Sequence, residues 1–338
     1  MKQKYNQTLL LIAAVVIFYA LVKTLIYFGV LSSYWQLVLD QSMIVTIGAL
    51  GLSIIYGFTG QFSLGHAAFY GIGAYTAGAI GKTIGHGDIL WFIIALIAGS
   101  LAAALVALLI GLPILRLRSD YLGIATLGFG IIVKVGMDNA NKVIPVLGGA
   151  TGMSGLPRVA NFEIIFLFFL AAILLVRNLI YSKYGRAFTS IREDEIAADA
   201  MGIDTTRYKT MAFVLGCALA GLAGSLYAHR YPFLHPASFD FLKSFDFLLI
   251  VVLGGLGSLS GTIVTAIGWA FLLEGLRFVL GEQFIDFRGV IYALILVVTI
   301  LMRPQGLFNG KELLFMKPPR LKTPVIKGEE GPHAGLGN

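Results

Sequence analysis

The sequence has 338 residues, few charged side chains and a single cysteine. Only 13% of its residues are Asp, Glu, Lys or Arg, whereas soluble domains carry about 25%. With 57% hydrophobic residues and a mean hydropathy of +0.85, the chain cannot bury its apolar surface in one aqueous globule. Because Cys217 is alone, an intrachain disulfide is excluded. The composition predicts an integral membrane protein.

Motifs typical of enzymes are also missing. The five histidines are scattered without HExxH spacing, and the chain has neither a GxSxG nucleophile nor a Walker A phosphate loop. The net charge of +7 is not gathered into a basic patch interleaved with aromatics, so we expect no nucleic-acid partner. These absences predict a chain that is not an enzyme, and we expect it to hold no cofactor or metal.

Long apolar runs predict an all-α polytopic fold of about ten transmembrane helices. Lys2 and Lys4 precede the first run as in a signal peptide, but no small-residue cleavage site follows, which indicates an uncleaved span. Lys and Arg are concentrated in alternate connecting segments, a pattern that places both termini in the cytoplasm. The predicted spans are 8–28, 37–57, 63–82, 90–112, 120–137, 162–181, 210–229, 244–260, 261–280 and 287–302.

The domain organisation is predicted to be simple. Residues 1–308 are expected to form one transmembrane domain that lies in membrane lipid. Residues 309–338 are rich in Pro, Gly and charge and show no apolar periodicity, so we expect a disordered cytoplasmic tail.

Glycine is abundant, with 41 residues, and one set has regular spacing. Ala212, Gly216, Ala220 and Gly224 recur every four residues along a single predicted span. In membranes, small residues at this spacing let helix backbones approach closely. We therefore expect this stripe to pack against neighbouring helices.

A polar loop at residues 57–66 interrupts the apolar pattern. It combines two glycines with Gln, Ser and His and carries no Lys or Arg, unlike an ordinary cytoplasmic connection. Such a composition favours backbone held at membrane depth where it lines a cavity. A tight helical hairpin whose polar groups bond to backbone explains it equally well. The candidate translocation residues are Gln61, Phe62, Ser63, Gly65 and His66.

The loop at 183–209 predicts a short cytoplasmic helix. Ser190 followed by Glu193 has the spacing of a capping box, and Gly202 is well placed to end the helix. Small apolar and charged faces on a sharply capped helix are typical of a docking element, although an ordinary connecting loop is the alternative. The candidate docking residues are Gly185, Arg186, Ser190, Arg192, Glu193, Glu195, Ala197, Ala198 and Gly202.

Several motifs give the loop a more specific meaning. The pattern Gly-Arg-Ala, Ile-Arg-Glu-Asp-Glu, Ala-Ala and Met-Gly-Ile in residues 185–203 resembles the ATPase-docking loop of LivM-type branched-chain amino-acid ABC permeases. Further stretches resemble this family in the same order, and they lie at 60–69, 119–130, 151–156, 252–261 and 303–308. One departure is Ile131, where many relatives carry an acidic residue. We expect Lys134 and Asp138 to pair with each other instead.

The resemblance implies a permease subunit of an ATP-driven type II ABC importer in the bacterial inner membrane. It implies a second homologous permease, two ATPase subunits that bind the ATP, and an extracytoplasmic substrate-binding protein. The implied cargo is leucine, isoleucine and valine, with urea or short-chain amides as the competing cargo. An ion-coupled secondary transporter is disfavoured because no mid-membrane ion site is evident, and Glu274 and Arg277 are spaced to pair on one helix.

Overall fold

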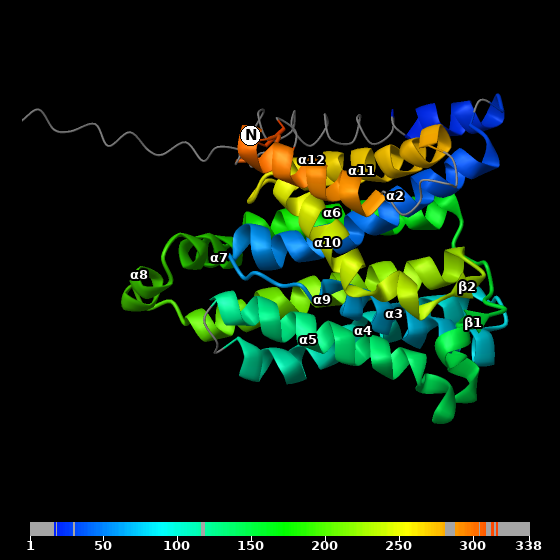
Figure 1. The fold of residues 1–338 in the computed structure, drawn as a ribbon, viewed down its shortest axis with the longest axis horizontal. Helices are drawn as coiled ribbons and strands as arrows, with labels where there is room; N and C mark the ends of the chain where they lie inside the picture. Colours follow the sequence, from blue (N-terminus) through cyan, green and yellow to red (C-terminus); the bar gives the residue numbers. More distant parts are fainter. Residues whose placement is uncertain are drawn as a thin grey trace, which may run out of the picture.

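The computed structural model describes residues 17, 19–29, 31–115, 119–280, 288–303, 305–308, 312–313 and 316. Within them the fold is all-α apart from one two-stranded sheet (Figure 1). The start of the predicted first span lies outside the described residues, as does almost all of the predicted tail at 309–338. Residues 19–27, which belong to that first span, are helical.

Six described helices are long and apolar enough to cross a membrane. The predicted apolar runs at these positions are therefore confirmed as helices. The six are α2 (Ser33–Leu52) continued by the π-helix η1 (Ser53–Phe58), α4 (Ile89–Ile114), α5 (Ser119–Asp138), α6 (Phe162–Ile180), α9 (Thr205–Arg230) and α11 (Leu259–Leu280).

Three further apolar helices lie outside these six. They are α3 (His66–Ile80), which continues as the π-helix η2 (Gly81–Gly85), α10 (Phe241–Gly254) and α12 (Arg288–Met302). At about 1.5 Å per residue, α10 is roughly 21 Å long, against a hydrocarbon core of about 30 Å. Non-helical backbone at 59–65 precedes α3, and a second break at 255–258 follows α10. The predicted span at 244–260 therefore ends earlier than expected.

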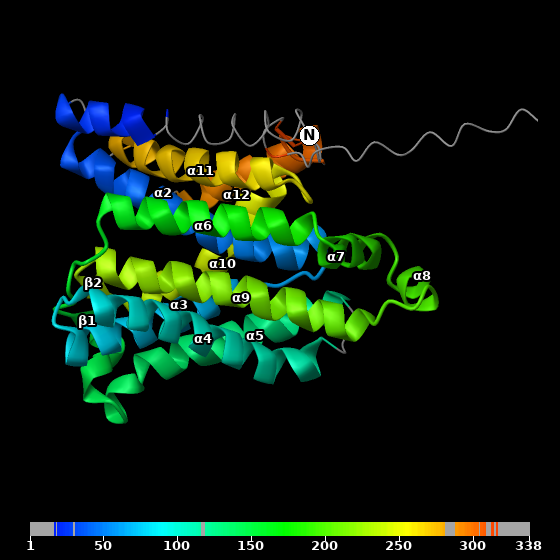
Figure 2. The same ribbon diagram turned by 180° about the vertical axis from the view of Figure 1, so that it is seen from behind.

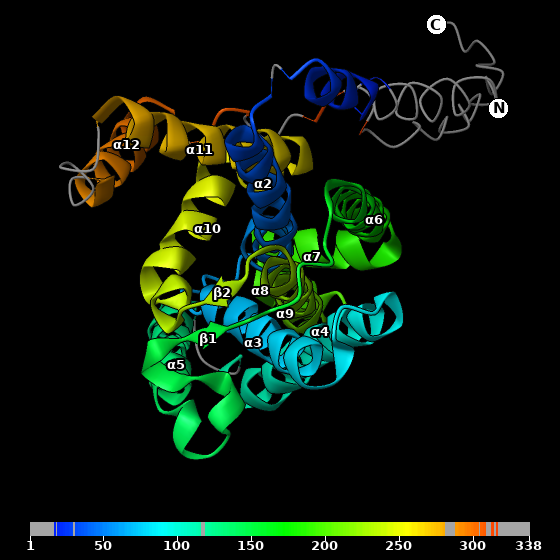
Figure 3. The same ribbon diagram turned by 90° about the vertical axis from the view of Figure 1, so that its right-hand side faces the viewer.

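Helix α9 lies at the centre of the bundle and contacts α2, α3 and α4 (Figure 3). Its small residues permit these contacts. A Cβ added to Gly216 would lie 2.5 Å from the Gly51 carbonyl oxygen of α2, and one added to Gly224 would lie 1.8 Å from the Tyr70 carbonyl oxygen of α3. Both distances are far shorter than a carbon–oxygen contact allows. The predicted packing role of the small-residue stripe is confirmed.

The two ends of the bundle differ in structure (Figures 1 and 2). Helices α7 (Lys183–Glu193) and α8 (Glu195–Ala200) project from one end, which we call the α7/α8 end. The other, the β1/β2 end, holds β1 (Met153–Ser154) paired antiparallel with β2 (Phe233–Leu234), so that Met153 faces Leu234. The 3-10 helices η3 (Ala140–Lys142), η4 (Pro145–Leu147), η5 (Gly149–Thr151) and η6 (Pro236–Phe239) connect the spans.

Several charged groups within the spans are paired. Lys134 and Asp138 lie 3.8 Å apart, as do Arg277 and Glu274, so both predicted pairs are confirmed. Asp40 is fully buried, and its carboxylate lies 2.7 Å from the Arg230 guanidinium. Because α9 ends beside the first turns of α2, Arg230, the last residue of α9, reaches the buried Asp40 of α2.

Candidate functional site

The prediction of a single helix from Ser190 to Gly202 is wrong, because the helix is interrupted at Asp194. The backbone of Asp194 is extended, with φ −157° and ψ 111°, and its carboxylate accepts hydrogen bonds from the amides of Ile196 and Ala197 at 2.9 and 3.0 Å. Aspartate is a strong N-cap, so a new helix starts here. The first helix is capped by Ser182 instead of Ser190.

Gly202 ends the second helix as predicted. Its φ of +85° lies in the left-handed region, and its amide donates to the Asp199 carbonyl at 2.9 Å while the Ile203 amide donates to Ala198 at 3.1 Å. This is the Schellman pattern of helix termination. The result is two short capped helices, α7 and α8, that form a compact projection.

The projection shows apolar side chains to its surroundings. Ile196 and Met201 are each 83% exposed, whereas Ile191 and Ala198 are buried. Beside them a groove of about 610 Å³ runs between α7, α8 and the end of α6. Exposed apolar groups next to a groove are typical of a protein-binding surface.

The remaining predicted docking residues divide between this groove and the packing of the projection. Gly185 is buried where α7 turns against the end of α6, and a Cβ added there would lie 1.8 Å from the Ile180 carbonyl oxygen. Arg186, Ser190, Glu193 and Ala197 line the groove. Burial raises the pKa of Tyr181, which lines the same groove, to about 12, so its hydroxyl stays neutral.

Arg192 points into the bundle and not outward with the other charges. Its guanidinium donates to the Gly57 carbonyl at 2.8 Å, at the last turn of η1, and to the Glu193 carboxylate at 2.6 Å. A Cβ added to Gly257 would lie 2.5 Å from the same guanidinium, and one added to Gly60 would lie 3.2 Å from the arginine side chain. Arg192 therefore joins the projection to both non-helical breaks, at 59–65 and 255–258.

Gln61 lies close to this junction. It lines a cavity of about 250 Å³ together with Arg192 and Glu195, and its amide donates to the Lys209 carbonyl at 3.2 Å. Lys209 in turn forms an ion pair with Glu195 at 2.5 Å. The structure thus brings a predicted translocation residue together with predicted docking residues.

The deeper part of the polar loop is enclosed. Ser63 is 1% exposed and His66 is fully buried, and Gly65 is also buried, whereas Phe62 is half-buried against Gly123 of α5. The Nε2 of His66 lies 2.8 Å from the Gly48 carbonyl oxygen, so Nε2 carries the proton. Its Nδ1 and the Ser63 hydroxyl have no hydrogen-bond partner among the described residues.

Helices α5 and α10 hold this loop in place. The Leu64 amide donates to the Thr126 hydroxyl at 3.0 Å, and a Cβ added to Gly65 would lie 2.3 Å from the Thr126 carbonyl oxygen. On the other side, the Ala67 amide donates to the Ser244 hydroxyl of α10 at 3.0 Å. The segments 60–69 and 119–130, far apart in sequence, therefore meet at one place.

Sequence reasoning missed two contacts at the α7/α8 end. Glu312 accepts from the amides of Leu259 and Ser260 at 2.6 and 2.9 Å and so caps α11. The Met316 carbonyl accepts from the Arg177 side chain at 3.3 Å. Both residues fall within a segment whose polar composition gave no signal of such contacts. Among the residues that the structure describes, no group of His, Cys, Asp and Glu is arranged to hold a metal ion.

Comparisons with known proteins identify relatives over most of the chain. A family model described as a permease component of the branched-chain amino acid transport system matches residues 34–300. The high-affinity branched-chain amino acid transport permease LivM of Escherichia coli K12 is 36% identical over 324 residues, which cover 86% of this chain and 72% of that protein. LivM of Salmonella typhimurium is 35% identical over 325 residues with the same coverage, and LivH of that organism is 25% identical over 288 residues, covering 78% of this chain and 91% of LivH. No solved structure matches.

Proposed function

Because the chain belongs to the family of permease components of branched-chain amino-acid transport systems, we propose that it is the membrane-spanning subunit of an ATP-driven importer for leucine, isoleucine and valine. It is a transport subunit and not an enzyme. The ATP is bound by separate partner subunits, and this chain needs no cofactor of its own.

Energy enters through the projection of α7 and α8. An ATPase subunit binds the exposed Ile196 and Met201 and the adjoining groove. The charged residues of the groove include Arg186 and Glu193. Apolar anchors surrounded by polar groups are the usual composition of a protein interface. Two ATPases are needed, one for this chain and one for a second homologous permease.

The observation that carries this proposal is the hydrogen bond from Arg192 to the Gly57 carbonyl, at 2.8 Å. It links a solvent-facing projection to the buried last turn of η1, directly before the non-helical backbone at 59–65. A rigid movement of α7 therefore pulls directly on the polar loop at 57–66. Such a link converts closure of the ATPases into alternating access of the pathway.

The pathway runs past the polar loop, at the contact with the second permease. Gln61, Ser63 and His66 offer hydrogen bonds without a fixed charge, and Phe62 and Gly65 shape the passage. Since Ser63 and His66 are enclosed by α5 and α10, the passage opens only when one of these helices moves. The contacts of the loop with Thr126 and Ser244 are the ones that must break.

The same arrangement supports a topology. The α7/α8 end faces the cytoplasm, with both termini, and the β1/β2 end faces an extracytoplasmic binding protein that delivers substrate. About ten helices cross the bacterial inner membrane, namely the six long ones, the shorter α3, α10 and α12, and one that includes residues 19–27. Residues 1–308 form the permease domain, and 309–338 form a cytoplasmic tail.

Urea or a short amide is the competing cargo, because a lining without fixed charge accommodates either. The test is uptake of labelled leucine and labelled urea by membrane vesicles that contain the whole complex, with and without the ATPase subunits. We expect leucine uptake that requires ATP and the ATPases. Urea uptake without leucine uptake would overturn the substrate, and uptake that persists without ATPases would overturn the transporter class.

A further inference from the structure

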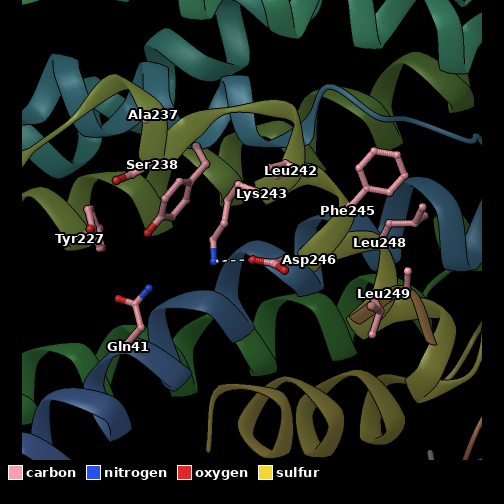
Figure 4. Close-up of a pocket in the computed structure, with 12 residues that line it drawn as sticks. Gln41, Tyr227, Ala237, Ser238, Leu242, Lys243, Phe245, Asp246, Leu248 and Leu249 are labelled. Atoms are coloured by element: carbon pink, nitrogen blue, oxygen red, sulfur yellow. Dashed lines mark hydrogen bonds and ion pairs between the residues drawn. The ribbon is translucent and has the colours of Figure 1, made fainter. Parts of the chain in front are cut away.

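A second site lies between the polar loop and the β1/β2 end. A cavity of about 650 Å³ opens there between α2, α3, α9 and α10 (Figure 4). Ligand pockets for small molecules commonly measure about 300–1,000 Å³. The residues that matter for the argument are Gln41, Tyr70, Leu242, Lys243, Asp246 and Leu248.

The cavity contains one cation and one anion side by side. Lys243 and Asp246 lie one turn apart on α10, and the ammonium is 3.1 Å from the carboxylate (Figure 4). Their side chains are only 21% and 18% exposed, so the pair is largely removed from water. Ionisable groups in this setting are costly, and in membrane proteins they commonly mark a substrate pathway.

Two polar groups beside the pair lack partners. The Tyr70 hydroxyl and the Gln41 side-chain oxygen are buried, line the cavity and make no hydrogen bond within the described part of the chain. Tyr70 as a whole is 1% exposed, so its hydroxyl cannot turn to bulk solvent. Buried polar groups are nearly always hydrogen-bonded, and two orphaned groups in one cavity indicate a ligand that is polar at one end.

Apart from Tyr227 and Ser238, the rest of the wall is apolar. Leu242 and Leu248 border the charged pair from the same helix, α10. The cavity therefore offers a positive group, a negative group and neutral hydrogen-bonding groups at one place, with aliphatic contacts next to them. A zwitterion with an aliphatic side chain matches each of these features.

We propose that this cavity binds an aliphatic α-amino acid, with its carboxylate on Lys243 and its ammonium on Asp246. The Tyr70 hydroxyl donates to the ligand carboxylate, the Gln41 oxygen accepts from the ammonium, and the side chain packs on Leu242 and Leu248. This inference rests on the proposed function and names the residues that receive the cargo before it reaches the polar loop. Tyr70 lies one turn beyond His66 on α3, so the two sites adjoin.

The first test uses the unmodified complex. The whole importer in lipid vesicles is irradiated with a diazirine analogue of leucine, and the labelled peptides are mapped. We expect labelling of residues 241–254. Excess leucine should abolish this labelling. Equal concentrations of leucinol or 4-methylpentanoate, each of which lacks one of the two charges of leucine, should not abolish it. Label elsewhere only, or equal competition by the singly charged analogues, would overturn the site.

The second test separates binding from a structural role of the ion pair. Lys243→Met and Asp246→Asn should each weaken leucine competition for labelling by about tenfold or more, the size expected for one hydrogen bond to a charged group. The double exchange Lys243→Asp with Asp246→Lys restores an ion pair but reverses its direction, so leucine binding should stay weak. Recovery of binding in the exchange variant would show that the pair is only structural.

Controls keep this inference distinct from the proposed function. Lys142→Met, at an exposed lysine of the β1/β2 end, should bind leucine like the native protein. If the native complex takes up leucine with ATP while both single variants bind leucine normally, the site is refuted and the transporter assignment stands. If the native complex takes up no leucine but labelling is as expected, the proposed function fails independently.

Discussion

Replacing Arg192 by methionine removes the guanidinium but keeps most of the apolar length of the side chain. The variant loses the 2.8 Å hydrogen bond to the Gly57 carbonyl and the 2.6 Å contact with Glu193. Only the first is expected to matter, since the Glu193 side chain is 68% exposed and exposed ion pairs contribute about 0–1 kcal/mol.

The magnitude follows from the charge on the donor. A hydrogen bond to a charged group contributes about 1.5–3 kcal/mol, which corresponds to roughly a tenfold to hundredfold change in an equilibrium constant. If this bond carries the movement of α7 to the polar loop, the Arg192→Met variant should hydrolyse ATP but transport about tenfold less leucine per ATP. Lysine at this position retains a charged donor group and should restore part of the coupling.

The assay measures leucine uptake and phosphate release in the same vesicles that contain the whole importer. Arg303→Met serves as a matched control, because Arg303 is an exposed arginine at the same end of the bundle. Its ratio of leucine to ATP should equal that of the native complex. An unchanged ratio in Arg192→Met, with the complex fully assembled, would refute the reasoning.

Two further predictions concern stability and topology. Asp40→Asn should lower the free energy of unfolding by about 3–5 kcal/mol, because it leaves the Arg230 charge without its buried partner. Asp138→Asn, at a partly exposed pair, should lower it by less than about 1 kcal/mol. Thermal unfolding in detergent compares the two variants. In a variant without the native cysteine, Asp199→Cys and Ser154→Cys should react with a membrane-impermeant maleimide from opposite faces of the membrane. Reaction of both cysteines from the outer face would contradict the proposed orientation.

The positions of the long helices could be predicted from sequence because a bilayer demands long apolar runs. The close contacts of Gly216 and Gly224 were also predictable, since a four-residue spacing of small residues has one physical use in a helix. The break at Asp194 was not. Ser190 and Glu193 satisfied the spacing of a capping box, and only the backbone shows that Ser182 and Asp194 provide the caps.

The role of Arg192 could not be read from its neighbours in sequence. It is followed by three acidic residues, 193–195, that suggest a solvated face, yet its main partner is a carbonyl 135 residues away. The cavity at the β1/β2 end was hidden for the same reason. Gln41, Tyr70 and Lys243 come from three different helices, and no local pattern relates them.

The most direct test of the account is a cross-link from the tip of α8. Ile196→Cys, in a variant without the native cysteine, is modified with a benzophenone maleimide in the assembled importer and irradiated. Because Ile196 is an exposed apolar residue of the projection, the account predicts a covalent adduct between this chain and an ATPase subunit, and none from the same probe at Ser154→Cys. An assembled complex that gives no ATPase adduct at Ile196, or gives one at Ser154, would contradict it.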